Sequence, residues 1–503
     1  MLKAPLAVLA FVGTLATRTN AQEYPLLPRA QTRWITQEVS GDAAYEHVRF
    51  MTQFHRPGGG SDGLLKVAQH YEAAARELGL AEVELLMQPC DERPWNAKFA
   101  DLWLMGDAPE RLASTLQTAV HLADYSRPAD VTCGLVDIGD GSEEELAKLD
   151  VKGKLVLTYG SLQGVMKEAV CARGALGVVW YPSPFTTGNG IDGGGSARPD
   201  QIRWLSLPSA DEADCKPTFA FGLSLDQGLA LRAKLAAAGK PLEVHAHVES
   251  AFTSAAGDQP WQVMVTAKLP GTDPSLPAVV FSGHLQEEAT SANDDGTGCA
   301  STFEVARTLK VLVDSGRIPR PRRSLLFWWV TEISSQRQLF ADRPELVKTL
   351  WLNINQDMSG CEQSLDLMRK QNVTRLPAAR FHALNDVMEA AVEYLVAANN
   401  FELSQLLNGI PLYPAPVLAH RGSKHRWNAE AIFFHNNTDH MTFLEAPIGL
   451  PGITFTNMPD RYIHSSDDDL WNIDATQLGR SAAAAALIGY TLASAGEASV
   501  APL

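Results

Sequence analysis

One short stretch of this 503-residue chain gathers many acidic groups beside a histidine. Residues 283–298 read GHLQEEATSANDDGTG, with His284 followed by two glutamates and then by the pair Asp294 and Asp295. Carboxylates held close together destabilise one another unless a positive charge lies between them, so the stretch predicts a cation site. A solvated acidic loop is the alternative for any single Asp-Asp pair, and only the context elsewhere in the chain decides between the two.

Other candidate ligands lie far away in the sequence. They are Glu332, Asp357 and His464. Together with His284 and Asp294 they offer two imidazoles and three carboxylates, a donor set that suits zinc or manganese. A lone buried histidine is more often a hydrogen-bonded core residue than a ligand. Five such residues, each placed at the end of a predicted strand or at the head of a helix, favour the metal site.

The predicted strands are continuous apolar runs, which is typical of strands buried on both faces of a mainly parallel sheet. The runs are PAVVFSG (277–283), RSLLFWWV (323–330), TLWLNIN (349–355) and GITFTN (452–457). His284 follows the first run, Glu332 the second and Asp357 the third, and His464 lies just past the fourth. Ligands of open parallel sheets gather beyond the carboxyl ends of the strands, so we expect these residues to meet at one edge.

The pattern of apolar residues and turns along the sequence divides the chain into three regions. Residues 22–127 form the N-terminal part of the main domain, and from about Glu38 to Gln88 they show helical periodicity, as in LLKVAQHYEAAARELGL. Residues 128–250 hold short apolar strands between turns and predict a separate, strand-rich inserted module. Residues 251–503 alternate strands and helices and complete the main domain. The expected fold class is α/β, with a mainly parallel, mixed sheet flanked by helices.

Composition excludes some classes of partner. The formal net charge is −16, whereas nucleic-acid phosphates are bound by clusters of Lys and Arg, so neither a nucleic acid nor an anionic membrane is expected as partner. Residues 1–21 combine Lys3, a short apolar run and the small Ala21, which is typical of a cleaved signal peptide. We therefore expect an exported protein, periplasmic or extracellular. The six cysteines show no CxxC spacing, and one or two disulfides are possible after export.

Several motifs in this order resemble a known family. The segment GHLQEEATSANDDGTGCASTFEVARTL, together with INQDMSG (354–360), NTDHMTFLEAPIGLPGITF (437–455) and YIHSSDD (462–468), is similar to the two-zinc metallopeptidases that include aminopeptidase Y, bacterial leucyl aminopeptidases and glutamate carboxypeptidase II. The inserted module resembles a protease-associated domain. The resemblance implies a phosphorylase/hydrolase-like zinc peptidase fold, two zinc ions per chain and peptide substrates.

Residue by residue, the resemblance assigns metal ligands. Asp294 would bridge two metals, His284 and Asp357 would complete one site, and His464 would belong to the other. A water held between two such ions is acidic enough to attack a carbonyl. Asp468 fits the carboxylate that orients a metal-bound imidazole, with a solvated acidic loop as its alternative.

The chain departs from the family at two places. Where the family has two adjacent glutamates, one a general base and one a ligand, WWVTEISSQ contains only Glu332. Glu332 aligns with the base; if it is instead the ligand, the base is Glu287 or Glu288, two residues that we otherwise place in a flexible loop. The family's HLD is also HLQ here, so Gln286 contributes hydrogen bonds but no charge.

Two further residues match a family segment near the substrate cleft. Asp439 and His440 in TDHMTF are candidates for binding substrate or steadying an oxyanion, and a capped turn before a strand is the alternative. The basic loop HRGSKHRW (420–427) is expected to be solvated.

The sequence thus predicts an exported zinc exopeptidase, specifically an aminopeptidase. A carboxypeptidase or dipeptidase on the same scaffold is the alternative enzyme. A non-enzymatic binding protein is the alternative from another class, and the missing second glutamate keeps it open.

Overall fold

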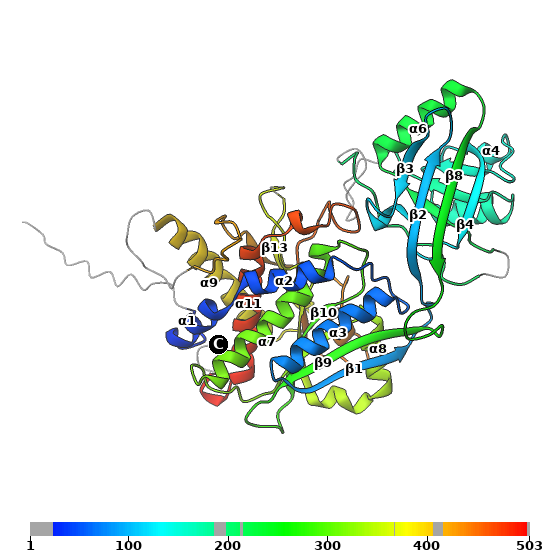
Figure 1. Cartoon of the computed structure of the whole chain (residues 1–503). Coiled ribbons are helices and arrows are strands. Elements are labelled where there is room, and N and C mark those ends of the chain that lie inside the picture. The colour runs from blue at the N-terminus through cyan, green and yellow to red at the C-terminus, as the bar shows by residue number, and fades with distance from the viewer. Residues whose placement is uncertain (1–23, 186–197, 212–214, 367, 406–415, 500–503) are drawn as a thin grey trace, which may run out of the picture.

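Two separate β-sheets organise the chain (Figure 1). The computed structural model describes residues 24–185, 198–211, 215–366, 368–405 and 416–499. The expected signal peptide, residues 1–21, lies outside these ranges. Among the described helices, none is long and apolar enough to cross a membrane.

The first sheet has eight strands in the order β1-β9-β11-β10-β12-β15-β13-β14. Its strands are β1 (Ala81–Pro89), β9 (Trp261–Leu269), β10 (Ala278–His284), β11 (Leu325–Val330), β12 (Leu350–Gln356), β13 (Gln371–Thr374), β14 (Ala429–Ile432) and β15 (Gly452–Thr456). The central strands β11, β10, β12 and β15 run parallel, while β9 and β13 pair with their inner neighbours antiparallel. The predicted mixed α/β sheet is confirmed, and its four central strands are the four continuous apolar runs.

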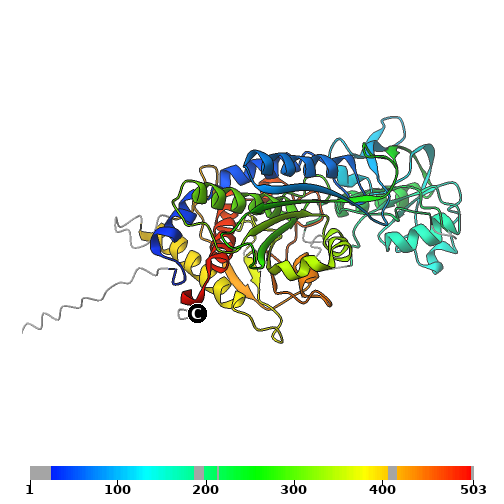
Figure 2. The ribbon, with the colours of Figure 1, turned by 90° about the horizontal axis from the view of Figure 1, so that it is seen from below.

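Helices cover both faces of this sheet, because its central strands are apolar on both sides. Val279 and Phe281 belong to the larger core, and Val280 between them belongs to a smaller core on the opposite face. Figure 2 shows the sheet between the blue N-terminal helices and the yellow-green α8. The helices are α1 (Arg29–Glu38), α2 (Gly41–Met51), α3 (Asp62–Glu77), α7 (Gly298–Asp314), α8 (Ser334–Asp342), α9 (Leu384–Gln405), α10 (His440–Leu444) and α11 (Ala475–Ser494).

The second sheet has seven strands in the order β3-β2-β8-β4-β5-β6-β7 and a hydrophobic core of its own. Its strands are β2 (Asn96–Leu104), β3 (Glu110–Ser114), β4 (Ala129–Asp137), β5 (Leu155–Thr158), β6 (Gly177–Trp180), β7 (Ala220–Gly222) and β8 (Leu242–Ala251). Three helices accompany them: α4 (Glu143–Leu146), α5 (Leu162–Val165) and α6 (Leu225–Ala238).

The start of the inserted module needs a correction. The module was expected to begin at residue 128, but β2 and β3 already belong to the second sheet because β2 pairs with β8 over its whole length. The sheet therefore runs from Asn96 to Ala251. Within it Cys171 forms a disulfide with Cys215, and the other four cysteines are free.

Candidate metal centre

The carboxylate of Asp295 connects two strands of the first sheet and the helix α7 through hydrogen bonds. Its Oδ2 accepts a hydrogen bond from the backbone N–H of His284 at 2.8 Å, and its Oδ1 accepts from those of Gly298 at 2.9 Å and Met358 at 3.2 Å. These donors lie at the end of β10, the start of α7 and just past the end of β12. A Cβ on Gly298 would lie 1.9 Å from the carbonyl oxygen of Gln356, so only glycine permits this approach.

Asp294, the neighbour of Asp295, faces two histidines with its two carboxylate oxygens. Its Oδ1 lies 3.2 Å from His284 Nε2, and its Oδ2 lies 3.1 Å from His464 Nε2. Asp357 Oδ1 is 3.9 Å from the same nitrogen of His284. The structure thus brings together all four residues that the sequence assigned to metal, with Asp294 between the two histidines.

The position of Asp294 is set by Asp468. The carboxylate of Asp468 is fully buried and accepts hydrogen bonds from the backbone N–H groups of Asn293 and Asp294, each at 2.9 Å. Asp468 was expected to orient a metal-bound imidazole, and that expectation is wrong for the described contacts, because its oxygens accept from these two backbone N–H groups and from Asn472 Nδ2 at 3.1 Å. It acts on the bridging carboxylate instead.

Two sets of ligand atoms overlap at Asp294. His284, Asp294 and Asp357 form one set, and Glu287, Asp294 and His464 form the other, with all atoms of a set within 4.8 Å of one another. Glu287 is 4% exposed, and its Oε2 lies 4.0 Å from His464 Nε2. Glu287 therefore offers the second set a carboxylate within reach of Asp294 and His464.

The expected flexible loop around Glu287 and Glu288 is a further correction. Both residues are buried, because the guanidinium of the fully buried Arg56 binds the backbone of this segment. It donates hydrogen bonds to the carbonyl oxygens of Leu285, Glu288 and Ser291 at 2.7, 3.1 and 3.0 Å. A loop anchored in this way holds a ligand in place.

The protein groups of the cluster fit a bound cation. Asp357 Oδ1, Glu287 Oε2 and both carboxylate oxygens of Glu288 are buried and accept no hydrogen bond from the described residues. Burial, and after it the charges of Asp294 and Glu288, raises the pKa of Glu287 well above its usual value. Buried carboxylates beside two histidines are a donor set for a zinc-type dication, which would supply the missing positive charge.

Glu332 follows β11 and lies at the edge of the cluster. Its backbone N–H donates to Gln286 Oε1 at 2.7 Å, and Gln286 Nε2 lies 3.5 Å from His284 Nδ1. Burial raises the pKa of Glu332 to about 8, against the opposing effect of His284. Glu332 also belongs to a third candidate ligand set, with His284 and Glu287.

Asp439 and His440 were expected to contact the substrate, but their side chains do not reach the cavity. Asp439 Oδ1 accepts a hydrogen bond from the backbone N–H of Ile333 at 2.6 Å, and His440 Nε2 lies 2.8 Å from the carbonyl oxygen of His435. Both side chains are fully buried, and neither lines the described cavity. The predicted substrate contact is corrected to a positioning role for Asp439, which fixes the residue that follows Glu332.

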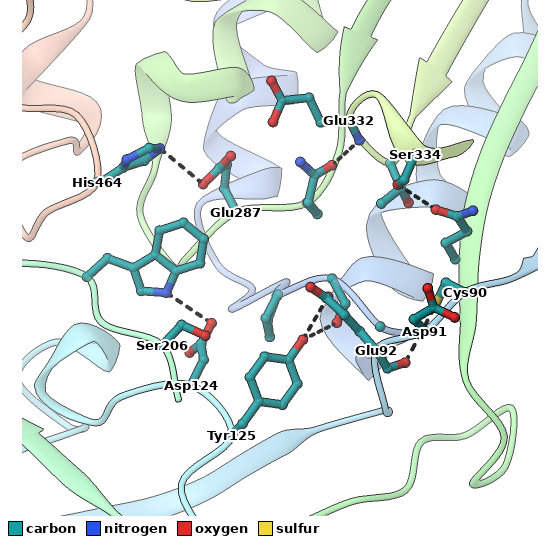
Figure 3. A pocket seen from close by; sticks show the side chains of 17 residues that line it. Cys90, Asp91, Glu92, Asp124, Tyr125, Ser206, Glu287, Glu332, Ser334 and His464 are labelled. Atoms are coloured by element: carbon teal, nitrogen blue, oxygen red, sulfur yellow. Dashed lines mark hydrogen bonds and ion pairs between the residues drawn. The ribbon is translucent and has the colours of Figure 1, made fainter. Parts of the chain in front are cut away.

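A cavity of about 540 Å³ opens beside the cluster. In Figure 3, His464, Glu287 and Glu332 lie along one side of it, and Glu92 and Tyr125 lie along the other. Its described lining also includes Trp204 and Ser206 from the second-sheet region. The cavity is therefore built by both parts of the chain.

Several residues of this site escape sequence reasoning. Glu287 was considered only as a base, although its place three residues after His284 was a usable clue. His55, Asp124 and Trp204 line or support the cavity from distant segments, and no motif marks them. The basic loop 420–427 is exposed for the most part, and its Arg421 pairs with Glu46 of α2.

Comparisons with known proteins agree with this geometry. Residues 264–405 match the model of peptidase family M28. The fold is similar to that of a zinc aminopeptidase from Bacillus subtilis, at 16% identity and a TM-score of 0.59, with 91% of this chain and 96% of that chain covered. A peptidase M28 precursor from Shewanella amazonensis gives 14% identity and a TM-score of 0.60, with coverage of 92% and 96%.

An aminopeptidase from Aneurinibacillus sp. strain AM-1 gives 19% identity and a TM-score of 0.50, with 93% of this chain and 97% of that chain covered. No curated protein matches the sequence. The matched segment spans β10, α7, β11 and β12 and contains four of the five candidate ligands together with the candidate base Glu332. The four ligands are His284, Glu287, Asp294 and Asp357. Residues 264–405 therefore match peptidase family M28, and the chain shares the fold of these solved peptidases.

Proposed function

We propose that the protein is an aminopeptidase that uses two zinc ions. The observation that carries the direction of cleavage is the charge of the cavity. Its described lining includes Asp91, Glu92, Asp124, Glu287 and Glu332 but no lysine or arginine. A free α-ammonium group is attracted to such a lining, whereas a C-terminal carboxylate is repelled and finds no cation to bind it.

The two ligand sets share the work of holding the ions. His284, Asp294 and Asp357 would hold one ion, and Glu287, Asp294 and His464 would hold the other. Zinc in these sets would polarise the scissile carbonyl and make the attacking water more acidic.

With Glu287 as a ligand, Glu332 is left for proton transfer. Its carboxylate accepts a proton from the attacking water as the water oxygen bonds to the carbonyl carbon, and donates that proton to the leaving nitrogen as the C–N bond breaks. Burial raises the pKa of Glu332 above its usual value, which makes its carboxylate a stronger base. The backbone of the segment is held for this role by Gln286 and Asp439.

We also infer export to the periplasm or the extracellular space. Residues 1–21 support it as a signal peptide, and the Cys171–Cys215 disulfide supports it because disulfides persist in oxidising compartments. The second sheet, Asn96–Ala251, fits a protease-associated domain in its place within the chain. N-terminal sequencing of the mature protein tests the inferred export.

The direction of cleavage is tested with three versions of one short peptide. The zinc-loaded protein should release the first residue from the unblocked peptide and from the C-terminally amidated one, and should leave the N-acetylated peptide intact. Glu332→Gln serves as the control that the activity belongs to this protein. Release of the last residue from the N-acetylated peptide would show a carboxypeptidase and overturn the proposal.

A further inference from the structure

The second sheet presents a cluster of possible metal ligands on its outer face. Strand β8 contains the sequence His245-Ala246-His247, and successive side chains of a strand point to opposite faces of the sheet. Ala246 is fully buried, whereas the side chains of His245 and His247 are about one-third exposed, at 32% and 31%. The two imidazoles therefore stand side by side on the solvent face.

The register of the neighbouring strands puts carboxylates beside these histidines. Strand β8 lies between β2 and β4, as Figure 1 shows. His247 pairs with Asp101 of β2 on one side and with Asp130 of β4 on the other. Directly paired residues of antiparallel strands have Cβ atoms about 4.5–5.5 Å apart, so one imidazole has an aspartate on each flank.

The side chains converge on one point of this face. Asp130 Oδ1 lies 3.6 Å from His245 Nε2, and one ligand atom each from Asp130, His245 and His247 lies within 4.8 Å of the other two. Glu249, two residues further along β8, lies 3.0 Å from His247 Nε2 with its Oε1. Small rotations of these exposed side chains would bring three donors to the roughly 2.0–2.2 Å that zinc requires.

The neighbours of the cluster support a ligand role for the first histidine. Thr132, which pairs with His245 across the strands, has its Oγ1 3.0 Å from His245 Nδ1. When Nδ1–H donates to that hydroxyl, Nε2 keeps its lone pair and faces Asp130. A hydrogen bond from the second ring nitrogen is the usual arrangement of a metal-binding histidine.

We propose that Asp130, His245 and His247 form a separate transition-metal site on the second sheet. Two neutral imidazoles and one carboxylate select zinc(II) or copper(II) over magnesium and calcium, which prefer oxygen ligands. The site shares no residue with the cluster around Asp294 and lies on a different sheet. By joining β4 to β8, a bound ion would stabilise the pairing between these two strands.

The test compares the zinc content of matched variants at saturating zinc. The double variant His245→Gln/His247→Gln should bind one zinc ion per chain fewer than the wild type. The control variant His420→Gln/His425→Gln removes two other exposed histidines, and it should keep the wild-type content. Peptidase activity should be unchanged in both, because none of the four residues lines the catalytic cavity.

Binding of copper(II) provides a second test, which does not depend on the measured zinc content. Its electron paramagnetic resonance spectrum in the wild type should include a signal with two nitrogen ligands, and the single variant His247→Gln should lose that signal while its circular dichroism stays wild-type. Equal zinc content in the wild type and the double variant would overturn the proposal. So would a copper signal that persists in His247→Gln.

Discussion

Trp204 donates its backbone N–H to the carbonyl oxygen of His464 at 2.9 Å, and the rings of the two residues meet edge to face with centroids 5.4 Å apart. A residue of the second-sheet region thus lies directly against a candidate metal ligand. The contact continues as an isolated β-bridge between Arg203 and Ser465. The inserted region therefore forms part of the wall of the cavity.

The same tryptophan begins a chain of hydrogen bonds to the other ligand loop. Trp204 Nε1 donates to Asp124 Oδ2 at 2.9 Å, and His55 Nε2 lies 2.6 Å from Asp124 Oδ1. His55 Nδ1 in turn accepts from the backbone N–H of Ala289 at 2.8 Å, so its Nε2 carries the proton and donates to Asp124. Asp124 joins the loop of Glu287 to the neighbour of His464.

Asp124→Asn should weaken this connection. The amide has one oxygen for two donors, so either His55 or Trp204 is left facing an NH₂ group, and an unsatisfied buried donor costs about 1–3 kcal/mol. We expect that loss of unfolding free energy in urea, together with weaker binding of the second zinc ion in a titration. Asp211→Asn, which removes an exposed carboxylate paired with Arg127, is the control. Zinc binding of Asp124→Asn equal to that of the control would show that the connection does not support the metal site.

Gly298→Ala should disturb the metal centre through the backbone. The added Cβ would lie 1.9 Å from Gln356 O and 2.0 Å from Asp295 Oδ1, so α7 and β12 must separate. Forcing atoms into a packed region typically costs about 1–3 kcal/mol. Thermal unfolding should show this loss, and Gly164→Ala, on the exposed α5 with no atom closer than 3.7 Å to its new Cβ, should not. A Gly298→Ala protein as stable as the wild type would contradict the described approach of α7 to β12.

Acid should destabilise the protein partly through His47. Burial, and after it the neighbouring His70, lowers the pKa of His47 from 6.5 to about 4. Between these two pH values the unfolded chain binds a proton at His47 that the folded chain does not, so the stability contribution is present above pH 6.5 and is lost as the pH falls toward 4. Metal-free protein should therefore lose more unfolding free energy over this window than His47→Gln does. If the unfolding free energies of the metal-free wild type and of His47→Gln fall equally over this pH window, His47 makes no such contribution.

The central sheet was predictable because burial on both faces leaves a direct trace in the sequence. Runs such as LLFWWV in β11 have no polar residue on either side of the strand, and a polar residue that follows such a run marks the strand's carboxyl end. That rule placed His284, Asp357 and Glu332 correctly at one edge. The family motifs added the pairing of Asp294 with both histidines.

The burial of Glu287 was not predictable from its neighbours in sequence. An acidic pair within polar and small residues has the same pattern whether water or protein surrounds it. The residue that buries this loop is Arg56, 232 positions from Glu288, and no local pattern reports such a contact. The positioning roles of Asp439 and Asp468 were missed for a related reason, since backbone amides as partners leave no trace in side-chain types.

The start of the inserted module was misplaced because β2 and β3 lie before the run of short apolar strands that begins near residue 128. Strand β2 alternates buried and partly exposed residues, and only its pairing with the distant β8 assigns it to the second sheet. The change of texture near residue 128 marks the first of the parallel-paired strands, β4, rather than the boundary of the module.

The division of labour between Glu287 and Glu332 is the centre of this account, and the zinc content of two matched variants tests it most directly. Both Glu→Gln changes keep the shape of the side chain and remove its charge. Glu332→Gln should keep the wild-type zinc content while its kcat falls by a factor of about 10² to 10⁴, the usual cost of removing a general base. Glu287→Gln should bind one zinc ion per chain fewer than the wild type. A Glu332→Gln protein that has lost an ion, beside a Glu287→Gln protein with the wild-type content, would contradict the account and make Glu332 the ligand.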